Sequence, residues 1–230
     1  MRRTVAASAV LIAVTAVLDA GVPQKKPLPF CADGPGVKVP AQLLPVDEAS
    51  RRPDFFTYRA RLQVAVADSD LDVLVAAADP NIRLGFGGEA GRDELRKAMS
   101  GADGPGVWKE LARILALGGA FRHASSFEAP YVFSQWPDRA DAFECAAILG
   151  SNVSVRSAAS TDAPVVARVS YAIIRTPGEA RPVEGWSLVQ LANGQQGFVK
   201  NEYLGSPNGL RAIFTLTNGQ WRMTALVAGD

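Results

Sequence analysis

The chain of 230 residues has few of the side chains from which hydrolytic and metal sites are built. His123 is its single histidine, which argues against a zinc amidase, because such sites need several histidine or acidic ligands. Cys145 lies in an apolar alternating run, which does not suit a thiol nucleophile, and no Gly-x-Ser-x-Gly motif is present. The formal net charge is only +1, and the 24 Lys and Arg residues are scattered. We therefore expect no metal, no cofactor and no nucleic-acid partner.

The chain also lacks an apolar run of the roughly 20 residues that a membrane span needs. The N-terminal run from Val5 to Leu18 has 14 residues. It follows the basic Arg2 and Arg3 and precedes the small residue Ala20, which is typical of a secretory signal peptide. We expect residues 1–20 to be a signal peptide whose cleavage leaves no stable membrane span. The mature protein would be periplasmic or secreted, and an uncleaved anchor is the alternative.

Cysteine is scarce, and the two that occur are Cys31 and Cys145. Export would place both in an oxidising compartment, where a disulfide is the default state. Such a bond would tie the entry segment to the end of the first domain. Two unrelated buried thiols are the alternative.

Proline content and apolar spacing divide the first part of the chain. Residues 21–50 hold six prolines and are interpreted as an extended linker or a surface wrap. Residues 51–150 are predicted to form an α+β domain with helices first and strands after them. The spacing of apolar residues predicts helices over residues 53–67, 70–78, 92–99 and 107–117, and strands over 82–86, 131–134 and 142–149.

The later part of the chain has the short, evenly spaced strands of a small β-barrel, over residues 151–207. A hairpin is expected around Asn193-Gly194, because both residues tolerate positive φ. A second hairpin, around Asn218-Gly219 within residues 208–230, is not needed by such a barrel. We expect it to return to the α+β domain and complete it. The predicted fold class is therefore α+β, with the barrel as an insertion.

Residues 152–207 resemble a bacterial SH3-like domain. The matching segments, in chain order, are Asn152-Val153-Ser154-Val155-Arg156-Ser157, Ser160-Thr161-Asp162-Ala163-Pro164-Val165-Val166, Gly185-Trp186-Ser187-Leu188-Val189, Gly194-Gln195-Gln196-Gly197-Phe198-Val199 and Tyr203-Leu204. The chain departs from the family at Ala159, where proline is usual, and in a longer loop at residues 175–184. It also resembles an uncharacterised family of secreted bacterial proteins with one SH3-like domain, which implies no activity. The helix-rich start and the terminal Gly-x-Trp hairpin are loosely similar to cone-shaped α+β domains of the nuclear transport factor type.

Two motifs resemble ligand sites but lack their sequence context. Residues 85–90 match G-x-G-x-x-A, yet no second parallel strand ending in an acidic residue follows, so a glycine turn is favoured over a nucleotide site. Residues 68–72 are similar to a calcium loop, but Val73 stands where such loops need glycine. Helix capping by Ser69 and Asp72 is favoured there.

Paired carboxylates are the remaining route to hydrolysis, because a glycosidase needs only two of them. The candidates are Glu110, Glu128, Asp138, Asp141 and Glu144, and ordinary surface carboxylates are the alternative.

Aromatic recognition is the chemistry that the predicted barrel supports best. Tyr171, Trp186, Phe198 and Tyr203 lie in or beside its strands and are the candidates to line a binding groove. The barrel core is favoured for Trp186 and Phe198, and exposure and burial stay equally open for Tyr171 and Tyr203. We expect a non-enzymatic protein whose SH3-like domain binds cell-wall peptide or an envelope protein.

Two other functions compete with this expectation. One is a structural or assembly protein of the envelope, which exposed apolar area near Tyr131 and Phe133 would favour. The other is a carboxylate-dependent cell-wall hydrolase, for which Glu128 is a candidate.

Overall fold

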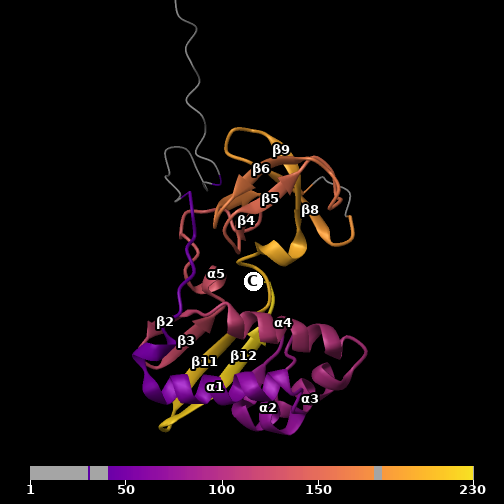
Figure 1. The fold of residues 1–230 in the computed structure, drawn as a ribbon. Coiled ribbons are helices and arrows are strands. Elements are labelled where there is room, and N and C mark those ends of the chain that lie inside the picture. Colours follow the sequence, from indigo (N-terminus) through magenta and orange to yellow (C-terminus); the bar gives the residue numbers. More distant parts are fainter. Residues whose placement is uncertain (1–30, 32–40, 179–182, 230) are drawn as a thin grey trace, which may run out of the picture.

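The computed structural model describes residues 31, 41–178 and 183–229, which form two β-sheets with helices against one of them (Figure 1). The expected α+β fold class is confirmed. The expected signal peptide, most of the proline-rich segment and the tip of the 175–184 loop lie outside the described residues. No helix in the described part of the chain is long and apolar enough to cross a membrane.

The four expected helices are present close to their predicted positions. They are α1 Pro53–Ala67, α2 Leu71–Ala77, α3 Arg92–Ser100 and α4 Gly104–Ala116. Three short helical segments were not expected: η1 Ala49–Arg51, α5 Tyr131–Ser134 and η2 Asn201–Tyr203. Helix α1 begins with Pro53 in its first turn, where a missing N–H costs nothing. Helix α2 is capped by Asp70, whose side chain accepts a hydrogen bond of 3.0 Å from the Val73 backbone N–H. The cap is therefore Asp70, and the expected capping by Ser69 and Asp72 is wrong.

The first sheet belongs to the helical part of the chain, and the two are called the α+β body. Its strands run in the order β1-β12-β11-β3-β2. The bounds are β1 Ala78–Arg83, β2 Ala120–His123, β3 Ser126–Ala129, β11 Arg211–Thr217 and β12 Gln220–Val227. β11 pairs with β3, placing Phe214 opposite Phe127, and β12 pairs in parallel with β1. The C-terminal hairpin thus returns to the centre of this sheet, as expected.

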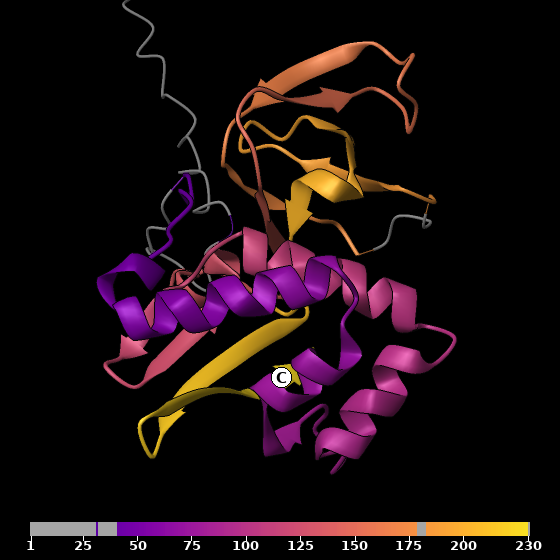
Figure 2. The same cartoon turned by 60° about the horizontal axis from the view of Figure 1, so that its bottom comes forward.

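Helices α1 and α4 cover one face of this sheet (Figure 2). The core of the body lies between the helices and the sheet. Phe55 of α1 is fully buried at its centre. Its ring centroid lies 4.3 Å from that of Phe127 and 4.8 Å from that of Trp221. Burying one such phenyl ring contributes about 1.5–3 kcal/mol, so this aromatic cluster joins the first helix to the C-terminal hairpin.

The second sheet, residues 145–205, is called the β-domain. Its strands run in the order β10-β4-β7-β8-β9-β5-β6. The bounds are β4 Cys145–Ile148, β5 Val153–Arg156, β6 Val165–Val169, β7 Ile173–Arg175, β8 Trp186–Gln190, β9 Gln196–Lys200 and β10 Leu204–Gly205. Five of these strands bury side chains in one core, so the sheet curls around its own apolar face. Among the described residues β6 and β10 form no ladder with each other, so the sheet is not a closed barrel.

Three expected strands differ in the structure. Residues 131–134 form the turn of helix α5, in which the Phe133 and Ser134 N–H groups donate to the Pro130 carbonyl at 3.0 and 3.1 Å. The strand expected at residues 82–86 begins four residues earlier, as β1. It contains Pro80, which an edge strand tolerates because one side needs no N–H donors. The strand expected at 142–149 is β4, which joins the β-domain and not the α+β body.

The two parts meet in a third group of buried side chains, called the junction cluster: Cys31, Leu43, Tyr131, Val132, Cys145, Ala147 and Ile173. The predicted disulfide between Cys31 and Cys145 is present in this cluster. Tyr131 is fully buried there, and burial raises the pKa of its phenol to about 12. Tyr131 itself therefore adds no exposed apolar surface of the kind that would favour an assembly role.

A strap of chain, residues 41–49, holds both parts together (Figure 1). Its Leu43 N–H donates to the Tyr171 carbonyl of the β-domain at 2.8 Å. Its Glu48 N–H donates to the Gly119 carbonyl of the α+β body at 2.9 Å. Asp47 accepts two hydrogen bonds, of 2.8 and 2.6 Å, from the buried guanidinium of Arg59. Of the two expected alternatives, a linker or a surface wrap, the described residues 41–49 form the surface wrap.

Candidate functional site

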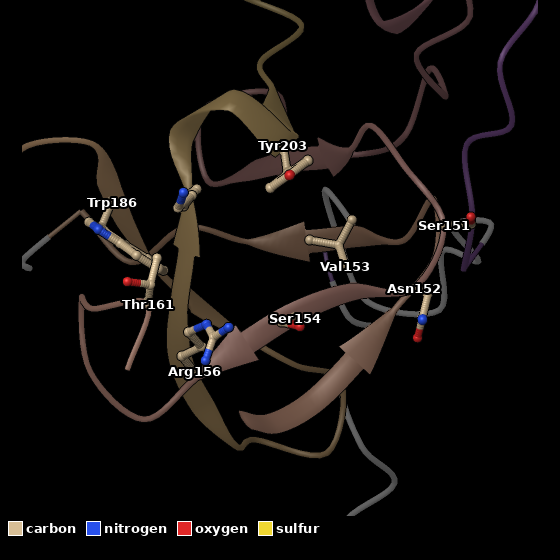
Figure 3. A pocket seen from close by; sticks show the side chains of 9 residues that line it. Ser151, Asn152, Val153, Ser154, Arg156, Thr161, Trp186 and Tyr203 are labelled. Atoms are coloured by element: carbon tan, nitrogen blue, oxygen red, sulfur yellow. The ribbon is translucent and has the colours of Figure 1, made fainter. Parts of the chain in front are cut away.

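The β-domain carries a groove of about 270 Å³ on its outer face, between β5, β8, β9 and the turn η2 (Figure 3). Nine residues line it: Ser151, Asn152, Val153, Ser154, Arg156, Thr161, Trp186, Lys200 and Tyr203. Figure 3 shows Trp186, Thr161 and Arg156 gathered at one end and Ser151 and Asn152 at the other. The groove therefore has an aromatic, cationic end and a polar end.

Strand alternation places the groove residues of β5. Val155 is fully buried in the core of the β-domain, so its neighbours Ser154 and Arg156 face outward. Arg156 Nη1 donates to the Ala163 carbonyl at 2.7 Å, which fixes the guanidinium against the loop between β5 and β6. That loop carries Thr161 to the groove.

Two turns hold the aromatic side chains of the groove. Gly185, just before Trp186, has φ of +75°, a conformation that glycine adopts without strain. Its carbonyl accepts from the Asn201 N–H at 2.9 Å, and Asn201 Oδ1 accepts from the Ser187 hydroxyl at 2.7 Å. These bonds fix η2, whose last residue, Tyr203, is 42% exposed. Trp186 and Tyr203 are therefore held by backbone turns and not by burial.

The electrostatics of the groove are positive. Arg156 and Lys200 line it, and none of the nine lining residues is acidic. Lys200 Nζ lies 6.0 Å from the Trp186 ring centroid, within cation–π range. Its ion pair with Glu202, at 3.8 Å, is long and largely exposed, so Lys200 keeps donors for a ligand. An anionic group with an apolar neighbour fits this arrangement.

Of the four aromatic residues expected in the groove, the structure brings Trp186 and Tyr203 together there. Phe198 lies half-buried on β9, opposite Leu188 of β8, and does not line the groove. Tyr171 lies in the turn before β7, with φ of +50°, where its carbonyl holds the strap. Phe198 and Tyr171 therefore do not line this groove.

Sequence reasoning missed the cations Arg156 and Lys200. Arg156 ends the Val-Ser-Val-Arg alternation of β5, which does predict that it faces outward. Lys200 ends β9 in the same way. The two residues meet because β5 and β9 are neighbouring strands, with Arg156 opposite Phe198, and no local sequence pattern predicts this long-range pairing.

The glycine-rich motif is a turn, as expected. The Leu84 N–H donates to the Glu89 carbonyl at 2.9 Å, and this bond closes the loop. The Glu89 carboxylate lies against Gly85, where an added Cβ would come within 2.6 Å of it. A carboxylate in that position would repel a phosphate. No group of three or more His, Cys, Asp or Glu residues that could hold a metal occurs in the described ranges.

The structure separates most of the candidate carboxylates. Glu110 pairs with Arg113 at 2.7 Å, and Glu144 pairs with Arg175 at 2.9 Å. Asp141 accepts two backbone N–H bonds in its own turn. Glu128 and Asp138, in contrast, line one pocket of the α+β body.

Cys145 and His123 do not form a catalytic thiol–histidine pair. Cys145 is bonded to Cys31 in the disulfide. His123 is exposed, and its Nδ1 lies 3.1 Å from the Ser125 hydroxyl.

Comparison with known proteins gives no independent assignment: no family model, no curated protein and no solved structure matches the chain. The resemblance to SH3-like domains therefore stays a prediction from the sequence.

Proposed function

We propose that the protein is a periplasmic or secreted binding protein whose SH3-like β-domain holds a carboxylate-bearing peptide, from the cell wall or from an envelope protein. The groove carries the proposal, since it sets Trp186 and Tyr203 beside Arg156 and Lys200 with no acidic lining residue. Guanidinium and ammonium groups bind carboxylates through charge-assisted hydrogen bonds. Rigid aromatic side chains add contact area at low entropic cost. The disulfide is consistent with an oxidising compartment.

The groove suits a short segment and not a large substrate. Its volume of about 270 Å³ is slightly below the usual range for small-ligand sites, about 300–1,000 Å³, and it is open along the sheet surface. One or two side chains and a terminal or side-chain carboxylate fill such a volume. A protein or wall polymer would therefore be held by one short peptide stretch.

The test is co-sedimentation of the full exported chain with purified cell-wall sacculi, together with capture of envelope proteins on the immobilised chain. Arg156→Gln and Trp186→Ala are expected to weaken retention about tenfold or more, because a hydrogen bond to a charged group is worth about 1.5–3 kcal/mol. Arg96→Gln is the matched control: it removes one positive charge from α3, in the other part of the molecule. Retention that Arg156→Gln and Trp186→Ala leave unchanged, or no retention by either material, contradicts the proposal.

A further inference from the structure

The α+β body has a second pocket, of about 290 Å³, lined by β2, β3, α5 and the residues after α5. Its lining includes the two carboxylate residues Glu128 and Asp138 and the aromatic residues Phe133 and Trp136. We infer that this pocket binds an alkylammonium group, such as a lysine side chain or a small diamine. The inference is independent of the groove, which lies on the β-domain.

Glu128 is the centre of this pocket because its carboxylate is buried and poorly satisfied. Its side chain is only 10% exposed, on a strand paired on both sides, with β2 and β11. Within the described ranges its hydrogen-bonding partner is Arg122, whose Nη1 lies 3.4 Å from Oε1, at the long limit for such a bond. The Arg122 side chain is 70% exposed. A carboxylate can accept about four hydrogen bonds, so Glu128 retains most of its capacity.

The other groups in the pocket are also acceptors without a strong donor. The Ser134 hydroxyl oxygen is buried and has no hydrogen-bond partner among the described residues. Asp138 is exposed and adds a second negative charge. A ligand that only donates hydrogen bonds and carries positive charge satisfies these groups together.

The aromatic rings favour the same ligand. The Trp136 Nε1–H already donates to the Ala140 carbonyl at 3.0 Å, so the indole offers the pocket its ring and not a donor. The Phe133 ring already lies 4.6 Å from the Arg211 guanidinium carbon, so it engages a cation on one face within the protein. Ring faces attract ammonium groups and pack against their alkyl chains.

The size of the pocket sets the length of the ligand. A volume of about 290 Å³ is at the lower end of small-ligand sites, so an aminoalkyl chain fits and a polysaccharide segment does not. Arg122 would give up its long contact with Glu128 at low cost, since that contact is exposed on the arginine side.

The test is calorimetric titration of the full chain with cadaverine and with the blocked peptide acetyl-Gly-Lys-Gly-amide, which separates a free amine from a peptidyl lysine. Glu128→Gln keeps the shape of the side chain and removes its charge, and it is expected to weaken binding at least about tenfold. Asp138→Asn should weaken binding less, because this carboxylate is exposed. Glu144→Gln is the matched control, as it loses a carboxylate outside the pocket.

Each result decides the inference. Saturable binding of either probe that folded Glu128→Gln weakens, and that Glu144→Gln leaves unchanged, supports it. Asp138 is exposed, so Asp138→Asn takes the place of Glu128→Gln as the deciding variant if Glu128→Gln does not fold. The inference is overturned if neither probe gives saturable heat up to about 10 mM, if the neutral analogue 1-pentanol binds equally well, or if the deciding variant keeps wild-type affinity.

Discussion

Asp54 shows how one carboxylate can join two distant parts of the chain. It lies in the first turn of α1 and accepts hydrogen bonds of 3.0 and 2.7 Å from the Arg52 guanidinium. It also accepts a bond of 3.0 Å from the Trp221 indole N–H on β12. The Arg52 hydrogen bonds, and then that of Trp221, hold the pKa of the Asp54 carboxyl well below its usual range.

This pKa predicts a dependence of stability on pH. The folded-state pKa lies below the unfolded value of about 3.9, so ionised Asp54 stabilises the fold above about pH 4, and this contribution is lost as the pH falls through the folded-state pKa. Asp54→Asn should therefore lose less stability than the wild type between about pH 5 and pH 2. Urea unfolding at both pH values measures the difference. Asp72→Asn, at a surface ion pair with Arg96, is the control, and curves for wild type and Asp54→Asn that stay parallel contradict the prediction.

At the scale of single residues, the sequence predicted that aromatic side chains line the groove, but it did not predict which residues line it. Aromatic residues beside short strands suggest recognition, which made Trp186 and Tyr203 candidates, although the barrel core was favoured for Trp186. Phe198, for which the core was also favoured, is half-buried on β9 and does not line the groove. Arg156 and Lys200 come from β5 and β9, which are neighbouring strands of the sheet although they are far apart in the sequence, so no local sequence spacing predicts their meeting.

At the scale of elements, turn chemistry was the most reliable guide. Asn193-Gly194 and Asn218-Gly219 both lie in hairpin turns, with positive φ at Gly194, Asn218 and Gly219. Local sequence patterns predicted the wrong secondary structure where tertiary contacts determine it. Residues 131–134 have the composition of a strand, but they form a helical turn in which two N–H groups donate to the Pro130 carbonyl.

The glycine pair that ends α4 also fixes how closely β2 and β3 approach. A Cβ added at Gly119 would overlap the Glu128 carbonyl oxygen and lie 3.0 Å from Cε1 of Phe127. Gly119→Ala is therefore expected to destabilise the protein by about 1–3 kcal/mol, because the strand must move away from its partner. Guanidinium unfolding measures this change.

The control for Gly119→Ala is Gly106→Ala, at a helical position in α4 where nothing lies within 4 Å of an added Cβ. This variant should gain about 0.5–1 kcal/mol, since alanine loses less backbone entropy in a helix. A Gly119→Ala variant as stable as the wild type would show that the β2–β3 contact is not as close as described.

At the scale of the whole molecule, the β-domain is an insertion held at several points. It leaves the α+β body after α5 and returns to it at β11, so both of its ends are tied to one sheet. Arg113 of α4 donates to the Leu204 carbonyl of β10 at 3.3 Å, and the strap of residues 41–49 bonds to both parts. The groove therefore has a fixed orientation relative to the α+β body, which a domain on one flexible linker would lack.

The disulfide is the covalent part of this attachment, and its removal tests the whole arrangement. Cys31 and Cys145 are 114 residues apart in the sequence, so the bond closes a long loop in the unfolded chain. In the chain-entropy model such a loop stabilises the folded state by about 4–5 kcal/mol. The double variant Cys31→Ser with Cys145→Ser should therefore unfold at a clearly lower guanidinium concentration than the oxidised protein. Dithiothreitol should lower the midpoint of the wild type and leave that of the double variant unchanged. Equal midpoints for the oxidised wild type and the double variant would mean that the buried side chains of the junction cluster alone hold the β-domain to the α+β body.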